Sequence, residues 1–175
     1  MIRIATCEDV PAILKIYAPY ILTSTATFEY DVPSLEEFRG RIESTLRRYP
    51  YIVAEMDGAI VGYAYAGVFK DRAAYDHCVE VTVYLRHDSC GTGIGAALYE
   101  ALEEHLQEMG ILNLYACIAV TDTEDEYLTN RSAHFHERLG YRTVGRFTKC
   151  GYKFSRWYDM VWMEKFIGEH KEDFV

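Results

Sequence analysis

The chain has 175 residues, half of them apolar, which is enough for one domain with a substantial core and too few for two comfortable ones. Its net charge of −9 argues against nucleic acid as a partner, because phosphate backbones are bound by clustered Lys and Arg side chains. No apolar run approaches the roughly 20 residues of a membrane helix, and the first residues lack a signal-peptide pattern. We therefore expect a single domain over residues 1–175 that is cytoplasmic and makes no membrane contact.

The cysteines, at positions 7, 78, 90, 117 and 150, are odd in number and form no C-x-x-C pair. This spacing argues against both a disulfide framework and a structural zinc site. We expect reduced, small buried residues and no metal.

The N-terminal part predicts a short strand over residues 2–4 and two helices. Thr6 with Asp9 resembles a capping box for a helix near residues 8–22, and Ser34 begins a second helix that ends before Pro50. The segment between them, residues 23–30, is β-branched and aromatic and is either a strand or a loop over a pocket.

The middle of the chain predicts a hairpin followed by a strand, a turn and a helix. Residues 51–56 and 59–68 form the hairpin around Asp57-Gly58, the strongest short turn signal in the chain. Residues 79–85 form a β-branched strand, a glycine-rich turn follows, and apolar residues then keep helical spacing up to Gly110.

The C-terminal part predicts a strand over residues 111–120, an acidic segment without a strand over 121–128 and a helix over about 130–139. Two more strands are expected near residues 141–149 and 157–164. No repeat or linker interrupts the pattern.

The glycine turn is typical of a phosphate site. Gly91, Gly93 and Gly95 let the backbone approach a ligand, and the first free amides of the next helix point towards it with the positive end of the dipole. A dinucleotide fingerprint is disfavoured because no acidic residue lies about 20 positions further on, and a Walker loop because no Lys-Ser or Lys-Thr follows.

Two motifs and the tail together resemble a known family. Val83-Tyr84-Leu85 with the glycine turn, and residues 130–141, look like the signature motifs of the GCN5-related N-acetyltransferases (GNAT). Residues 72–75, 79–80 and 151–159 are similar to the phosphinothricin and methionine-sulfone acetyltransferase branch. The resemblance implies an α/β (α+β) fold with a mixed, mostly antiparallel sheet, splayed in the middle and flanked by about four helices. It also implies acetyl-CoA as acetyl donor, a small amine as acceptor, and a homodimer.

The chain departs from the pattern of this family at three positions. Cys90 stands where the turn usually opens with Arg or Gln, which places more of the pyrophosphate contact on backbone amides. Asp76 and Cys78 stand where the branch usually carries Arg and Thr, which bears on the acceptor.

Acetyl transfer to an amine requires a base, and Glu80 is the one carboxylate in the buried strand beside the expected thioester. The alternative is a structural salt bridge to Arg72 or Lys153. His136 is either a proton donor to the leaving thiolate or a packing residue, and Asn130 is a pantetheine contact, an N-cap, or both.

The remaining candidates bind the two substrates. The expected acetyl-CoA contacts are Val83, Tyr84, Leu85, Gly91, Thr92, Gly93, Ile94, Gly95, Ala96, Asn130 and Ser132. The expected acceptor contacts are Phe28, Glu29, Arg72, Tyr75 and Lys153.

The leading hypothesis is an enzyme that acetylates the α-amino group of a small amino acid or analogue. A polyamine or aminoglycoside acetyltransferase is the nearest rival, and Arg72 and Lys153 argue against it because they would repel a polycation. A catalytically silent acetyl-CoA-binding module that regulates a partner is the third, and the presence of Glu80 argues against it.

Overall fold

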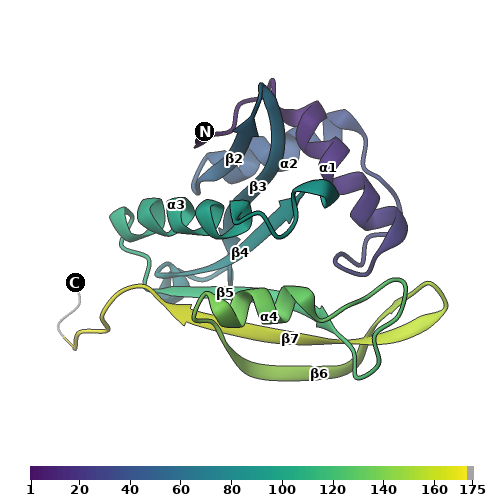
Figure 1. The fold of residues 1–175 in the computed structure, drawn as a ribbon. Helices are drawn as coiled ribbons and strands as arrows, with labels where there is room; N and C mark the ends of the chain where they lie inside the picture. Colours follow the sequence, from purple (N-terminus) through teal and green to yellow (C-terminus); the bar gives the residue numbers. More distant parts are fainter. Residues whose placement is uncertain (173–175) are drawn as a thin grey trace.

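The computed structural model describes residues 1–172, which form a seven-stranded sheet with four α-helices (Figure 1). The strands are β1 (Ile2–Ile4), β2 (Tyr51–Met56), β3 (Ala59–Val68), β4 (Cys78–Leu85), β5 (Asn113–Val120), β6 (Arg142–Lys153) and β7 (Arg156–Phe166). The helices are α1 (Val10–Thr23), α2 (Leu35–Leu46), α3 (Ile94–Glu108) and α4 (Arg131–Arg138), with short 3-10 turns at Ala73–Tyr75 and His87–Ser89. None of the helices in this part of the chain is long and apolar enough to cross a membrane.

The sheet has the order β1-β2-β3-β4-β5-β7-β6, and every neighbouring pair is antiparallel except β4 and β5. The parallel pair joins only three residues on each strand and ends where Glu80 lies beside Tyr115. Beyond this point the two strands diverge, as Figure 1 shows. The predicted mixed, mostly antiparallel sheet with a central splay is confirmed.

The helices cover the sheet unequally. One core lies between α3 and the sheet, where Val79 and Val81 of β4 meet Leu98 and Leu102. Because side chains alternate along a strand, Glu80, Thr82 and Tyr84 project from the opposite face. There α1 and α2 form a second core with aromatic residues of β2 and β3.

Local signals in the sequence explain most of the element boundaries. Ser34 accepts a hydrogen bond from the Glu37 amide and begins α2 as predicted. Asp57 and Gly58 both have positive φ, as the predicted hairpin turn requires. The Thr6–Asp9 capping box is half formed: the Asp9 carboxylate accepts the Thr6 amide at 2.7 Å, while α1 begins only at Val10.

Three expectations need adjustment or correction. Thr23 is the last residue of α1, and residues 24–30 form a loop and not a strand. The strand predicted for residues 141–149 continues to Lys153, because the Lys149 amide leaves the ladder to bond the Asp159 carboxylate and the chain then resumes pairing at Gly151. The expectation of buried cysteines is wrong: Cys78 is half-buried and the other four are exposed, since they lie on loops, on the edge strand or on the uncovered sheet face.

Candidate active site

The glycine turn ends at the start of α3 and leaves the first amides of the helix unused. Gly91 and Gly93 have φ values of 79° and 89°, a region that side-chain-bearing residues rarely adopt, and no side chain caps the helix. Gly95 was expected to let the backbone approach a ligand, but here it makes room for a side chain: a Cβ at this position would lie 3.1 Å from the ring of Phe135. Two of the three glycines therefore shape the backbone, and the third allows α4 to pack against α3.

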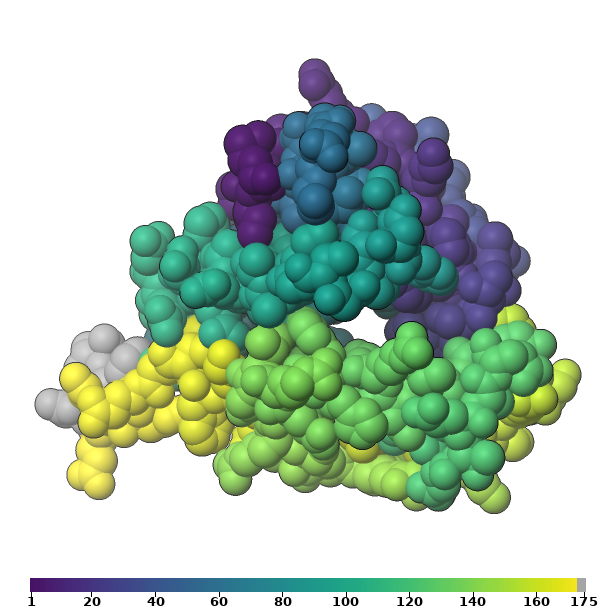
Figure 2. Space-filling view, viewed as in Figure 1, coloured from purple at the N-terminus to yellow at the C-terminus, as the bar shows by residue number. Residues whose placement is uncertain are grey.

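An opening passes through the molecule beside this turn. Figure 2 shows it between the upper half, coloured purple to teal, and the lower half, coloured green to yellow. It coincides with the divergence of β4 and β5 after Glu80. A linear molecule that enters here would run along the free edge of β4 towards Glu80.

The free edge of β4 presents main-chain groups from alternate residues. The Arg86 amide bonds Val61 of β3, whereas the Leu85 carbonyl accepts the Tyr20 hydroxyl at 2.6 Å on the other side. By alternation, Val83 and Leu85 face the splay, and the main-chain groups of Tyr84 face β3. The Tyr84 side chain lies against α1 and bonds the Ala26 carbonyl, so the structure does not bring Tyr84 to the splay.

Glu80 lies at the apex of the splay and is half-buried. Its carboxylate makes no hydrogen bond or ion pair with any of residues 1–172, so the alternative salt bridge to Arg72 or Lys153 is absent there. Burial raises the pKa of Glu80, and the positive charge of Lys70 opposes the shift. A half-buried carboxylate with a raised pKa and no structural partner is suited to accept a proton.

An aromatic surface that the sequence analysis missed adjoins Glu80. The Phe69 ring stacks on Tyr115 at 4.2 Å and meets Trp162 edge-on at 5.7 Å. Tyr115 pairs with Glu80 across the strands and projects from the face opposite the buried Leu114. The alternation of residues 113–120 is the signal that would have placed Tyr115 beside Glu80.

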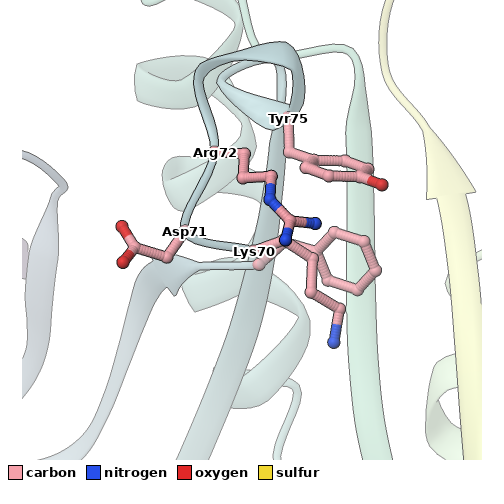
Figure 3. A pocket seen from close by; sticks show the side chains of 5 residues that line it. Lys70, Asp71, Arg72 and Tyr75 are labelled. Carbon is pink, nitrogen blue, oxygen red and sulfur yellow. The ribbon is translucent and has the colours of Figure 1, made fainter.

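Arg72 and Tyr75 lie together at the edge of this surface. They line a hollow of about 680 Å³ with Phe69, Lys70 and Asp71. Figure 3 shows Lys70, Arg72 and Tyr75 extending to one side and Asp71 to the other. The Arg72 guanidinium has no hydrogen bond or ion pair within the described residues, which leaves it available to an anionic group.

The other three predicted acceptor contacts are engaged elsewhere. Lys153 is 3% exposed, and its ammonium donates to the carbonyls of Ser24 and Thr27 at 2.8 Å each. Phe28 packs against Gly151 of β6. Glu29 forms an ion pair with Arg41 at 2.5 Å. These contacts hold the 24–30 loop against the sheet and α2.

His136 and Asn130 also have structural partners. His136 is 3% exposed; its Nδ1 lies 2.8 Å from the Ser132 carbonyl and its Nε2 lies 2.9 Å from the Tyr99 hydroxyl. The Asn130 side chain bonds both main-chain groups of Thr121 and does not cap α4. The Asn130 side chain thus links the end of β5 to the start of α4.

The arrangement is suited to transfer of a group from an extended, phosphate-bearing donor to an acceptor on the opposite face. The free amides at the start of α3 favour an anion, and the free edge of β4 offers main-chain hydrogen-bond groups. Glu80 lies at the apex of the splay, where the opening between the strands joins the two faces of the sheet. No cluster of three or more His, Cys, Asp or Glu side chains in residues 1–172 could hold a metal ion.

Comparison with known proteins agrees with this geometry. Residues 2–162 match the family model described as "Acetyltransferase (GNAT) domain". The chain is 36% identical over 166 residues to a phosphinothricin N-acetyltransferase of Streptomyces viridochromogenes, which covers 94% of this chain and 87% of that protein. It is 32% identical to an L-methionine sulfoximine/L-methionine sulfone acetyltransferase of Pseudomonas aeruginosa, covering 93% of this chain and 92% of that one.

A solved structure gives the same result. A GNAT superfamily phosphinothricin acetyltransferase from Sinorhizobium meliloti, in complex with AcCoA, superposes with a TM-score of 0.88 at 32% identity, covering 99% of this chain and 94% of that one. The chain therefore belongs to the GNAT family and is an acetyl-CoA-dependent N-acyltransferase.

Proposed function

We propose that this enzyme transfers the acetyl group of acetyl-CoA to the α-amino group of a small amino acid or analogue of the phosphinothricin, methionine sulfone or methionine sulfoximine type. The observation that carries the proposal is the unpaired Arg72 guanidinium in a hollow that adjoins Phe69 and, through Phe69 and Tyr115, Glu80. A guanidinium can hold a carboxylate through two parallel hydrogen bonds, which orients the acceptor. The acceptors named for the similar proteins support the same class.

We assign acetyl-CoA to the splay. Its pyrophosphate would lie on the amides of residues 91–96, and its pantetheine along the edge formed by Val83 and Leu85. Thr92, Ile94 and Ala96 would contribute through this turn, while Asn130 and Ser132 would shape the opposite wall from the start of α4.

In the proposed reaction, Glu80 accepts a proton from the acceptor amine, directly or through one water. The neutral nitrogen forms a C–N bond to the thioester carbonyl carbon, and the carbonyl oxygen takes up the π electrons as an oxyanion. When the carbonyl re-forms, the C–S bond breaks and the thiolate leaves with the bonding electrons. The nitrogen gives up its second proton, which neutralises the thiolate and leaves an amide and the free thiol. A free thiol has a pKa of about 8.5, so the leaving group needs little assistance. His136 is therefore assigned a packing role, since both of its ring nitrogens are occupied.

Lys153, Phe28 and Glu29 are proposed to act through the 24–30 loop and not by touching the acceptor. Tyr75 is proposed as an apolar wall beside Arg72, because its ring meets Phe69 edge-on at 6.1 Å.

The test is thiol release from acetyl-CoA with phosphinothricin, methionine sulfone, methionine sulfoximine, spermidine and kanamycin. The three amino acids should be acetylated in preference to the two polycations. Arg72→Ala should raise the KM for the amino acids about tenfold or more, whereas Arg47→Ala, which removes an exposed Arg at the end of α2, should not. Turnover of spermidine or kanamycin with all three amino acids inert would contradict the proposed acceptor.

We also propose that residues 1–175 act as one cytoplasmic domain that forms a homodimer. Large apolar side chains on the β6–β7 layer, namely Phe147, Tyr152 and Trp157, are 46–60% exposed and support a protein contact. Light scattering would show about twice the 20.2 kDa of one chain, cell fractionation would place the protein with the cytosol, and heating would give one unfolding transition.

A further inference from the structure

The glycines in and between the strands are required for different structural reasons, either a lack of space for a Cβ or a positive φ. Gly62 and Gly151 have no room for a Cβ, because Leu85 and Phe28 occupy the space. Gly58 has a positive φ. Gly67 of β3 fits neither explanation: its φ is not positive, and a Cβ built on it would meet nothing within 4 Å.

The empty space over Gly67 lies beside Glu80 in the sheet. Gly67 is paired directly with Glu80 across the β3–β4 ladder, and side chains of such pairs share one face with their Cβ atoms about 5 Å apart. The preceding rungs on this face are filled: Tyr63 and Tyr84 are in ring contact at 5.6 Å, and Tyr65 lies opposite Thr82. At the next pair on this face, Gly67 has no side chain, and only Glu80 contributes one.

The aromatic surface borders the same space. Phe69 follows Gly67 by two residues and stacks on Tyr115, the partner of Glu80 on its other side. Gly67 thus lies between Tyr65 and Phe69 along the chain and beside Glu80 across the ladder, and Phe69 also lines the hollow that contains Arg72. A glycine inside a strand often marks a bulge, a bend or a place where a ligand or another backbone comes close, and the β3–β4 register shows no bulge at Gly67.

We propose that Gly67 is a specificity-determining residue, and that the amine and α-carbon of the acceptor lie in the space over it, next to Glu80. The inference rests on the proposed function, since it takes Glu80 as the group that receives the proton. A side chain at position 67 would exclude acceptors according to their bulk around the α-carbon.

The test compares Gly67→Ala and Gly67→Val with the wild type. The control is Gly40→Ala, in α2, where a Cβ also meets nothing within 4 Å but the position is remote from Glu80. The measurements are kcat/KM for phosphinothricin, methionine sulfone and hydroxylamine, the Kd for acetyl-CoA by calorimetry, and the melting temperature.

We expect Gly67→Ala, which adds one carbon, to lower kcat/KM for the two amino acids about tenfold, and Gly67→Val, which adds three, about a hundredfold; a single methylene group in a tight site can change kcat/KM roughly 10- to 200-fold. Hydroxylamine, which has no α-carbon, should be affected much less, and the Kd for acetyl-CoA should change less than about twofold. Gly40→Ala should alter neither kcat/KM nor the Kd for acetyl-CoA, and should raise the melting temperature slightly, because alanine is favoured over glycine within a helix.

Two results would overturn the inference. Either Gly67→Val retains kcat/KM for both amino acids within about twofold, or hydroxylamine turnover falls as far as amino-acid turnover, which would mean that Glu80 itself is disturbed. If Gly67→Val does not fold, Gly67→Ala decides by the same criteria. Failure of the proposed function would appear separately, as wild-type enzyme that acetylates none of the amino acids.

Discussion

The Tyr99 hydroxyl and His136 Nε2 lie 2.9 Å apart and join α3 to α4 in the interior of the protein. The Ser132 carbonyl can only accept a hydrogen bond, so His136 Nδ1 carries the proton and Nε2 accepts from Tyr99. Burial lowers the pKa of His136 to about 4. The imidazole is therefore neutral wherever the enzyme is folded near neutral pH.

This neutral histidine should make stability depend on pH. The pKa of an unfolded histidine is about 6.5, so the unfolded chain binds a proton between that pH and 4 that the folded chain does not bind. Stability should be fully present above pH 6.5 and fall as the pH falls, by about 2 kcal/mol between pH 7.5 and pH 5 from this group. Urea unfolding of wild type and His136→Gln at both pH values tests this, and an equal loss in the two proteins would contradict it.

Removing the carboxylate of Glu80 should reduce catalysis and leave donor binding intact. Glu80→Gln should lower kcat by roughly 10² to 10⁴, the range for loss of a general base, while the Kd for acetyl-CoA stays within about twofold. Glu100→Gln, which changes an exposed carboxylate on α3, is the matched control. Near-normal turnover of Glu80→Gln at neutral pH would assign Glu80 a structural role.

Lys70 should set the pH at which the enzyme becomes active. The pKa of Glu80 is raised by burial and lowered by the charge of Lys70, so Lys70→Met should raise it further. The base must be deprotonated to act, and the acid limb of kcat/KM should therefore move to higher pH in Lys70→Met. Lys15→Met, an exposed position on α1, should leave the profile unchanged. Superimposable profiles for wild type and Lys70→Met would show that this limb does not report Glu80.

Gly93→Ala and Gly40→Ala should have opposite effects on stability. Gly93 begins α3 with φ 89°, where an alanine Cβ costs about 1–2 kcal/mol. The strain should also displace the first amides of α3 and weaken acetyl-CoA binding, as calorimetry would show. Gly40 lies within α2, where alanine is favoured over glycine by about 0.5–1 kcal/mol. Unaltered acetyl-CoA affinity in Gly93→Ala would argue against a phosphate site at this turn.

Lys153→Met should loosen the 24–30 loop. The variant removes the donor from the Ser24 and Thr27 carbonyls, which should cost about 1–3 kcal/mol in urea unfolding. The KM should then rise for every acceptor, hydroxylamine included. A KM increase confined to acceptors that carry a carboxylate would instead mean that Lys153 binds the acceptor directly.

Sequence reasoning succeeded where local chemistry decides the structure. Asp57-Gly58 specifies its turn within two residues, and β2 and β3 have the predicted bounds. The Ser34 cap and the strand, glycine turn and helix around Glu80 are likewise short-range features.

Sequence reasoning was less successful for side chains whose position depends on contacts with distant parts of the chain. Lys153 finds its partners more than 120 residues away, so nothing near it in sequence distinguishes a loop clamp from an acceptor contact. Tyr84 belongs to a signature motif but is turned to α1 by strand alternation. Tyr115 and Phe69 meet only after β3 and β5 are placed on either side of β4.

The short ladder between β4 and β5 also has a mechanical consequence. Only three residue pairs join β4 to β5, and this ladder connects strands β1–β4 to strands β5–β7. We call this ladder the seam, because the two parts of the sheet can rotate against each other there with the loss of few main-chain hydrogen bonds. The outward-facing amides of Val83 and Leu85 lie just past the seam, and we expect them to exchange with deuterium far faster than the inward-facing amide of Tyr84. A donor threaded through the opening would bridge the seam and slow that exchange.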